Sequence, residues 1–216
     1  MSEPFFSVIV PAHNASGHIR KLLDSVASQS SRDYELIVVC DNCTDDTEQI
    51  ARGYGAVTES VSFGRDGLSR DRGIELASGT WILFADDDDW FLHEYVFQQI
   101  HDAIMNHAGT GIDVLAFGYI FRTKGYRPPF GQELYTPRVA HVWAKCWRRQ
   151  AVIDAGAKFG DAVFSSDTYF LRAMREYCNG EAFPLNMPMY YYNFMRPGSQ
   201  TDLFVHGKIR QSPVAE

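Results

Sequence analysis

Short apolar runs that alternate with amphipathic segments constrain the fold of this chain more than any other feature. The runs at 7–10, 34–39 and 81–85 have the length of buried strands, and the first is expected to end before Pro11. Apolar side chains then recur at the spacing of one helix face after the first run, namely Ile19, Leu22, Leu23 and Val26. Strands alternating with helices of this length predict repeated βαβ units and an α/β fold with a mixed, mainly parallel sheet flanked by helices.

The same patterns predict six further elements. They are helices at about 44–54, 67–77, 93–107 and within 164–178, and strands at 57–63 and 113–121. The third helix is expected to turn Leu68, Ile74 and Ala77 inward. Residues 122–137 are rich in proline and predict a loop or hairpin, and the tail from about residue 206 is expected to fray or to dock weakly.

Length and charge exclude several classes of protein. A chain of 216 residues suits one domain with a real core, and a formal charge of −7 argues against a general nucleic-acid binder. No stretch reaches the roughly 20 apolar residues of a membrane span, and residues 1–7 lack a basic segment followed by an apolar one. We therefore expect no secretory signal and a cytoplasmic location. Peripheral contact with the inner face of a membrane is left open, and the oligomeric state is not indicated.

The four cysteines allow more than one interpretation. Cys40 and Cys43 have the spacing of a redox pair or of half a zinc site, whereas Cys146 and Cys178 do not form a second close pair. A thioredoxin-like site would place the first pair at the start of a helix, but Thr44 is the better helix start. We expect reduced structural thiols.

An acidic run follows the strand expected at 81–85. Asp86–Asp89 places four adjacent carboxylates at a strand end, where they repel one another unless a cation or hydrogen-bond donors hold them. A solvated acidic turn is the alternative. Polar segments also end the first two strands, at 11–14 and 40–45. The carboxyl ends of parallel strands lie on one edge of a sheet, so three polar strand ends predict a ligand site there.

Basic and acidic side chains near this edge fit a nucleotide. Asp41 could accept a ring N–H from a uracil-like or guanine-like base, or could equally form an Asx turn or helix cap. Arg65 and Arg70 could neutralise phosphates. The alternative is a solvated helix face, which suits Arg72 better than Arg70.

Seven segments resemble motifs of the family 2 glycosyltransferases. Segments 7–14, 37–45, 68–74 and 79–90 resemble S-V-I-V-P-A-Y-N, I-V-V-D-D-G-S-T-D, A-A-R-N-x-G-I and G-E-Y-I-x-F-L-D-A-D-D-x-W. Segments 142–149, 164–170 and 191–200 resemble V-W-N-K-L-Y-R-R, an E-D pair that opens a helix, and Y-x-Y-R-x-x-G-S. The resemblance implies a single GT-A domain over 1–216, with a nucleotide-sugar-binding half at about 1–110 and an acceptor and catalytic half at about 111–216.

The resemblance also implies an activity. It is the inverting, metal-dependent transfer of a sugar from a nucleotide-diphosphate sugar, with UDP preferred, to a glycan, a lipid-linked acceptor or another hydroxyl. Cell-surface polysaccharide or glycoconjugate synthesis is the expected setting. The chemistry is reasonable, because a divalent metal between two phosphates makes the nucleoside diphosphate a better leaving group.

Residue roles follow from the same motifs. The residues implied to bind the donor are Pro11, Asn14, Asp41, Arg70, Asp86, Asp87, Trp143 and Lys145, with Asp41 at the base and Arg70 near base and phosphate. Asp88 is implied to bind Mn²⁺ or Mg²⁺, and Asp86 to hold ribose, donor sugar or the metal. Within the run, Asp87 and Asp89 are the two expected least to touch the ligand directly.

The base implied by the resemblance is Asp167, which would take the proton of the acceptor hydroxyl. Its other plausible role is an N-cap of the helix within 164–178, which Ser165 or Ser166 could also provide. Trp143 and Lys145 would line the acceptor or donor pocket.

Four positions depart from the motifs: His13 replaces Tyr, Cys40 replaces Asp, Cys43 replaces Ser and Ser166 replaces Glu. The departures at 40 and 166 support an alternative, a GT-A-like module that binds a nucleotide-sugar or glycan without turnover. A nucleotidyltransferase would need a glycine-rich basic loop after the first strand, and 11–17 has one Gly and no Lys or Arg. An EF-hand loop fails at Trp90 and Phe91.

Overall fold

The structure, a computed structural model, describes residues 3–121, 131–133, 141–162, 166–193 and 196. Its elements in chain order are β1 (Phe6–Ala12), α1 (Ile19–Ala27), β2 (Tyr34–Asp41), α2 (Thr47–Gly53), β3 (Val57–Val61), α3 (Asp66–Leu76), β4 (Trp81–Phe84), β5 (Trp90–Phe91), α4 (Val96–Asn106), β6 (Val114–Phe121), β7 (Gly131–Glu133), β8 (Lys145–Arg148), α5 (Arg149–Asp154), α6 (Asp167–Tyr177) and β9 (Phe183–Tyr192).

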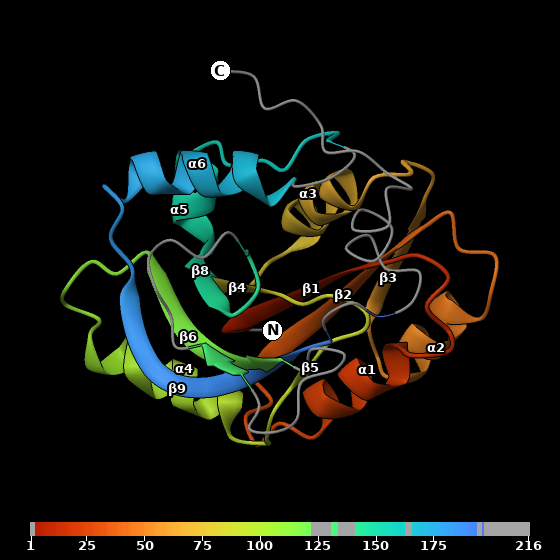
Figure 1. The fold of residues 1–216 in the computed structure, drawn as a ribbon, viewed down its shortest axis with the longest axis horizontal. Helices are drawn as coiled ribbons and strands as arrows, with labels where there is room; N and C mark the ends of the chain where they lie inside the picture. The colour runs from red at the N-terminus through yellow and green to blue at the C-terminus, as the bar shows by residue number, and fades with distance from the viewer. Residues whose placement is uncertain (1–2, 122–130, 134–140, 163–165, 194–195, 197–216) are drawn as a thin grey trace.

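One sheet runs through the molecule, in the order β3-β2-β1-β4-β8-β6-β9-β5, with β7 paired to β6. Strands β1 to β4 pair in parallel, whereas β8 joins β4 and β6 antiparallel and β9 returns parallel to β6. Helices α1, α2 and α4 cover one face, and α3, α5 and α6 cover the other (Figure 1). The predicted α/β class is confirmed.

The core has two layers, one on each face of the sheet. Strand β1 shows why, because alternate side chains of a strand point to opposite faces. Val8 and Val10 pack with α1 and α4, whereas Ile9 packs with the side of α3, α5 and α6. This sandwich fixes the carboxyl ends of β1, β2 and β4 at one edge of the sheet.

The prediction that the first strand ends before Pro11 is wrong, because β1 continues to Ala12. The Ile9 carbonyl accepts a hydrogen bond from the Ala85 N–H, so the backbone polar groups of Ile9 point toward β4. The backbone of Pro11, two residues later, points the same way. The paired register with β4 ends at Ile9 and Phe84. Proline is tolerated because its missing N–H points to the side where β4 has ended.

Helix α3 buries a different face from the one predicted. Ala77 is buried as expected, but Leu68 and Ile74 are only half-buried. The residues that α3 buries are Gly67, Ser69, Arg70 and Gly73. A Cβ at Gly73 would lie 2.2 Å from the Ile9 Cγ2, so the helix backbone lies directly against β1. This close approach aims the polar residues of α3 at the edge of the sheet.

Several elements had not been predicted, namely β5, β8, α5 and β9. Some predicted elements are shorter than expected: α2 begins at Thr47 and not at Thr44, β3 ends at Val61, and α4 begins at Val96. Strand β7 pairs antiparallel with β6, as a hairpin would. The rest of the predicted loop at 122–137, the possible cap at Ser165 and the tail lie outside the described residues.

Candidate active site

The ends of β1 and β2 are joined by side chains at their tips. The His13 Nδ1 lies 2.6 Å from the Asp41 carbonyl oxygen, and the Thr44 N–H donates to the Asn14 Oδ1 at 2.8 Å. Asn14 and Asn42 have φ of 45° and 52°, a left-handed conformation that Asn tolerates better than most residues. The two polar strand ends therefore meet as predicted, and Pro11 leads into this junction.

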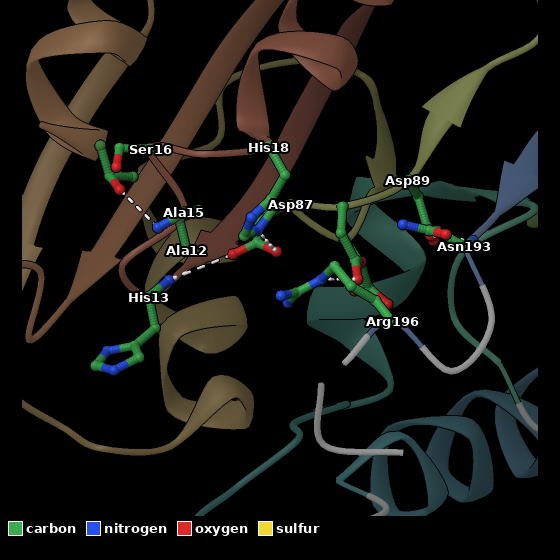
Figure 2. Close-up of polar contacts among 12 residues, drawn as sticks. Ala12, His13, Ala15, Ser16, His18, Asp87, Asp89, Asn193 and Arg196 are labelled. Carbon is green, nitrogen blue, oxygen red and sulfur yellow. Dashed lines mark hydrogen bonds and ion pairs between the residues drawn. The ribbon is translucent and has the colours of Figure 1, made fainter. Parts of the chain in front are cut away.

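The acidic run joins the same edge through Asp87. Its carboxylate accepts a hydrogen bond from the His13 N–H at 3.4 Å and lies 3.1 Å from the His18 Nε2 (Figure 2). Asp87 thus connects the third strand end to the first and to the start of α1. Contact between Asp87 and a donor stays a prediction.

Asp41 is buried and its carboxylate holds the chain that leads into α3. It accepts hydrogen bonds from the N–H groups of Gly64 and Arg65, both at 2.9 Å, and from the Ser69 hydroxyl at 3.4 Å. The Asn42 amide donates to it at 2.9 Å. Asp41 therefore forms neither an Asx turn nor a helix cap, because its backbone partners lie 23 and 24 residues further along the chain. Each Asp41 oxygen already accepts two hydrogen bonds, so a nucleotide base would have to displace one of them, of which the Ser69 contact at 3.4 Å is the longest; the base contact stays a prediction.

Arg70 is a buried clamp between two carboxylates. Its side chain is 7% exposed, and its guanidinium contacts the Asp86 carboxylate at 2.6 Å and also that of Asp66, one turn earlier on α3. Arg72 instead pairs with Glu59 and Glu75 near the surface. The solvated-face alternative is therefore wrong for Arg70.

Asp88 pairs with a residue that the sequence had not singled out. The Nε of Arg196, which Figure 2 labels, lies 2.6 Å from the Asp88 Oδ2. The Asp88 side chain is 12% exposed. Burial and the neighbouring Asp87 charge raise the pKa of Asp88 to about 6, against the opposing effect of Arg196. The sequence signal was present, because Arg196 lies within the motif-like segment 191–200.

Asp89 connects the acidic run to the end of β9 by a hydrogen bond. It is fully buried, and its Oδ1 accepts the Asn193 N–H at 2.8 Å, while the Asp86 N–H donates to the Tyr190 hydroxyl at 3.1 Å. Burial and the charges of Asp86 and Asp88 raise the pKa of Asp89 well above its usual value. The four acids of the run therefore have four different environments.

Asp167 begins α6 and faces the Arg70 clamp. Its Oδ2 accepts the Val142 N–H at 3.1 Å. Burial raises the pKa of Asp167 to about 6, with Arg70 lowering it and Asp86 raising it. Ser166 occupies the N-cap position, but its side chain makes no capping hydrogen bond.

Trp143 and Lys145 lie at the start of β8, next to Val142, whose N–H binds the Asp167 carboxylate. The Trp143 ring stacks on His141, with centroids 4.4 Å apart, and packs against Tyr192 at 4.5 Å. The buried Lys145 ammonium donates to the His141 carbonyl at 2.5 Å. Burial lowers the pKa of Lys145 to about 8, and the Asp167 charge opposes this shift. The site thus has an aromatic wall and a lysine beside its carboxylate.

The acidic run fits a divalent cation in its chemistry. Among the described residues, no three His, Cys, Asp or Glu side chains form a cluster that could hold a metal by themselves. Mg²⁺ typically takes only one or two carboxylates and completes its shell with phosphate and water. Asp86 and Asp88 offer that number of oxygen donors, and both have a pKa raised by burial, which a cation would oppose.

The cysteines do not contribute to this site as thiolates. All four are free, and burial raises the pKa of Cys40 to about 12. Cys40 and Cys43 form no disulfide in the structure, and their structural role stays a prediction. Across the residues that the structure describes, no helix combines the length and apolar character needed to cross a bilayer.

Comparison with known proteins gives consistent results. The profile of glycosyl transferase family 2 matches residues 7–154. A PGL/p-HBAD biosynthesis glycosyltransferase of Mycobacterium bovis is 32% identical over 133 residues, which are 59% of this chain and 51% of that protein. This chain therefore spans about half the length of that relative.

Solved structures agree in fold. S. aureus TarS 1–349 in complex with UDP-GlcNAc superposes with a TM-score of 0.75 and 24% identity, over 91% of this chain and 60% of that one. The mannosyltransferase PcManGT from Pyrobaculum calidifontis, in complex with GDP-Man and Mn²⁺, superposes with a TM-score of 0.66 and 17% identity, over 92% and 59%. Both likenesses show the GT-A fold. Since the family profile runs from the start of the sheet through α5, over more than half of the chain, the protein belongs to glycosyl transferase family 2.

Proposed function

We propose that the protein transfers a sugar from a nucleotide-diphosphate sugar to a hydroxyl acceptor, with inversion at the anomeric carbon. One observation carries the proposal: a single edge of the sheet gathers a half-buried acidic run, an arginine clamp and a separate carboxylate, Asp167, whose pKa is raised to about 6. A general base works best when its pKa lies near the working pH. Asp167 has that property and is not used in capping α6.

The donor would lie along the three strand ends. We assign Pro11 and Asn14 to its nucleotide side, with Asp41 accepting the ring N–H of the base. UDP is the preferred carrier because of the family resemblance, and the UDP-GlcNAc complex of TarS supports it. The GDP-Man complex of PcManGT makes a guanine nucleotide the second choice to test.

Arg70 and the acidic run would hold the diphosphate and the donor sugar. Asp88, assisted by Asp86, would hold Mn²⁺ or Mg²⁺, and the metal would neutralise charge on the leaving diphosphate. Mn²⁺ in the PcManGT complex supports this assignment. We assign Asp87 to the side of the site that binds the nucleotide-sugar, where its contacts with His13 and His18 hold the strand ends together.

The acceptor would enter between the aromatic wall and Asp167. Asp167 takes the proton of the acceptor hydroxyl. At the same time the acceptor oxygen forms the new bond to the anomeric carbon, and the bond from that carbon to the diphosphate breaks. Trp143 is buried against His141 and Tyr192 and would support the wall that meets the acceptor, and Lys145 places a cation beside the base. We propose a glycan or lipid-linked acceptor, in polysaccharide or glycoconjugate synthesis, because the M. bovis relative is named for PGL/p-HBAD biosynthesis.

The alternative is a GT-A-like module that binds its ligand without turnover. Its support is the pair of departures at Cys40 and Ser166. The retained carboxylates Asp86, Asp88 and Asp167 favour the enzyme.

Two measurements test the proposal. A thermal-shift screen of UDP- and GDP-sugars with Mn²⁺ identifies the donor, because a ligand of the folded state raises its stability with ligand excess. Nucleotide release with that donor and glycan acceptors then measures turnover. Binding without release for any acceptor would establish the module instead.

Asp167→Asn separates binding from chemistry. We expect wild-type donor affinity and a loss of transfer of about 10²- to 10⁴-fold, the usual contribution of a general base. Calorimetric donor binding and single-turnover transfer should be measured on the same preparation. Retained turnover would mean that another residue is the base.

A further inference from the structure

Asp66 lies in the first turn of α3 and its carboxylate connects two parts of the site. Its Oδ2 contacts the Arg70 guanidinium and also accepts the Ser166 hydroxyl at 3.3 Å. Ser166 is 100 residues away in the chain and precedes Asp167, the proposed base. A single carboxylate oxygen therefore joins the arginine clamp of α3 to the start of α6.

The position of Asp66 is fixed by tight packing between these helices. A Cβ on Gly67 would lie 2.5 Å from the Gly160 carbonyl oxygen and 2.9 Å from the Ser166 Cβ, so only glycine fits there. One turn later, the Asp71 carboxylate accepts the N–H groups of Phe159 and Gly160 at 2.9 and 3.0 Å. The contact between Asp66 and Ser166 is thus part of a packed interface and not a chance meeting of surface side chains.

The residue at 166 makes this contact informative. The family motif has Glu immediately before the proposed base, and this chain has Ser166. Ser166 is buried and its hydroxyl reaches a carboxylate on another helix. We propose that Asp66 supplies, from the start of α3, the carboxylate that position 166 lacks. In this role Asp66 is a positioning residue that holds Arg70 in place beside Asp167; the inference rests on the proposed function.

Electrostatics agree with that geometry. The charged groups that face Asp167 are Arg70, Asp86 and Asp66, together with Lys145 on the β8 side. Asp66 raises the pKa of Asp167, and Arg70 lowers it. Loss of the Asp66 charge removes the first effect, and because the Asp86 contact at 2.6 Å still retains Arg70 in the site, more of the Arg70 charge acts on Asp167. Both changes make Asp167 a weaker base.

The experiment compares Asp66→Asn with Asp71→Asn. Both remove one carboxylate charge from α3, but Asp71 binds backbone N–H groups and does not touch Arg70. With Asp66→Asn we expect a fall in kcat of about tenfold, a KM for the donor within about twofold, and an acid limb of the kcat profile moved to lower pH. Asp71→Asn, which carries the residue of the family motif, should change the melting temperature without moving that limb.

A rescue variant makes the test specific. Ser166→Glu in the Asp66→Asn background returns a carboxylate to the position where the motif has it, and should restore kcat and the acid limb. If this double variant does not fold, Asp66→Glu is the conservative replacement and should keep the acid limb at the wild-type pH. An Asp66→Asn variant with wild-type kcat and pH profile would overturn the proposal.

A readout without turnover separates this inference from the proposed function. Carbon-13 NMR follows the titration of the Asp167 carboxyl directly, with Asp167→Asn identifying the signal. The midpoint should fall in Asp66→Asn and stay in Asp71→Asn. Absent turnover in the wild type would reject the glycosyltransferase activity, whereas an unmoved midpoint in Asp66→Asn would reject the role of Asp66.

Discussion

The two ends of the acidic run are each held by an arginine, but in different ways. At one end Arg70 is 7% exposed, projects from a helix packed in the middle of the fold, and contacts Asp86 as well as a second carboxylate. At the other end Arg196 is 30% exposed, follows the last strand, and contacts Asp88. The Arg70 guanidinium is enclosed by the protein, whereas that of Arg196 is half-buried.

The difference separates a fixed contact from an exchangeable one. Removing one partner of a buried ion pair leaves an uncompensated charge and costs about 3–5 kcal/mol, whereas exposed pairs contribute about 0–1 kcal/mol. Asp86 and Arg70 therefore belong to the fold of the site. Asp88 is itself only 12% exposed, so the two ends differ in the arginine: we expect the half-buried Arg196 to yield its place to another cation more easily than the enclosed Arg70 does.

The largest effect is expected from Arg70→Ala. The substitution leaves Asp86 and Asp66 facing each other without their shared cation and should lower the free energy of unfolding by about 3–5 kcal/mol. Urea unfolding measures this directly. Arg72→Ala is the control on the same helix, because its pairs with Glu59 and Glu75 lie near the surface; it should cost about 1 kcal/mol or less. Equal losses for both variants would remove the distinction between the two kinds of contact.

Asp88→Asn tests the exchangeable end. An amide cannot supply the anionic oxygen that Mn²⁺ prefers, so we expect Mn²⁺-dependent binding of UDP to weaken by about 10- to 100-fold. Calorimetry with UDP and Mn²⁺ is the measurement, and Asp102→Asn on the exposed side of α4 is the control. Wild-type affinity in Asp88→Asn would reject the metal assignment.

As the pH rises from 4 to 6, we expect the contribution of Asp167 to stability to fall and kcat to rise. The pKa of Asp167 is raised to about 6, so between about pH 4 and pH 6 the folded state binds more protons than the unfolded state. This contribution to stability is present at low pH and is lost as the pH rises through 6. Transfer needs the ionised base, so kcat should fall about tenfold for each pH unit below 6.

The difference between wild type and Asp167→Asn isolates that contribution. Other carboxylates, such as Glu35, have a lowered pKa and act on stability in the opposite direction. The unfolding free energy of the wild type minus that of Asp167→Asn should therefore fall as the pH rises from 4 to 6. A flat difference, or a kcat independent of pH in this range, would contradict the prediction.

The sequence predicted the first half of the fold well because its signals there are local. Each strand among β1, β2 and β4 is a short apolar run, and α1 and α4 show a clear helical spacing. Because parallel strands end at one edge of a sheet, the sequence also predicted that Asp41 and the acidic run lie at the same edge. In the second half β8 has four residues and β9 contains Pro184 and Pro188, so neither shows the alternation that identifies a strand.

The partners of the acids could not be predicted, because they depend on contacts between distant parts of the chain. Arg196 and Asp88 are 108 residues apart, and Ser166 and Asp66 are 100 residues apart. Charge alone does not tell a buried clamp such as Arg70 from a surface residue such as Arg72. The close approach of α3 to β1 determines which of the two arginines is buried, and only the folded structure reveals it.

Arg196→Ala should have the smallest effect on stability and an informative effect on binding. Its loss should cost less than that of Arg70, because the Arg196 guanidinium is partly solvated and the Asp88 carboxyl, whose pKa is raised to about 6, can take up a proton. The Asp88 carboxylate then no longer has a protein cation, so Mn²⁺ without nucleotide should bind about two- to fivefold more tightly than to the wild type. Mn²⁺ titrations monitored by water proton relaxation measure this, with Arg32→Ala as a surface control. Weaker Mn²⁺ binding in Arg196→Ala would mean that Arg196 helps to build the cation site and does not compete for it, and the contrast with Arg70 would then be one of degree only.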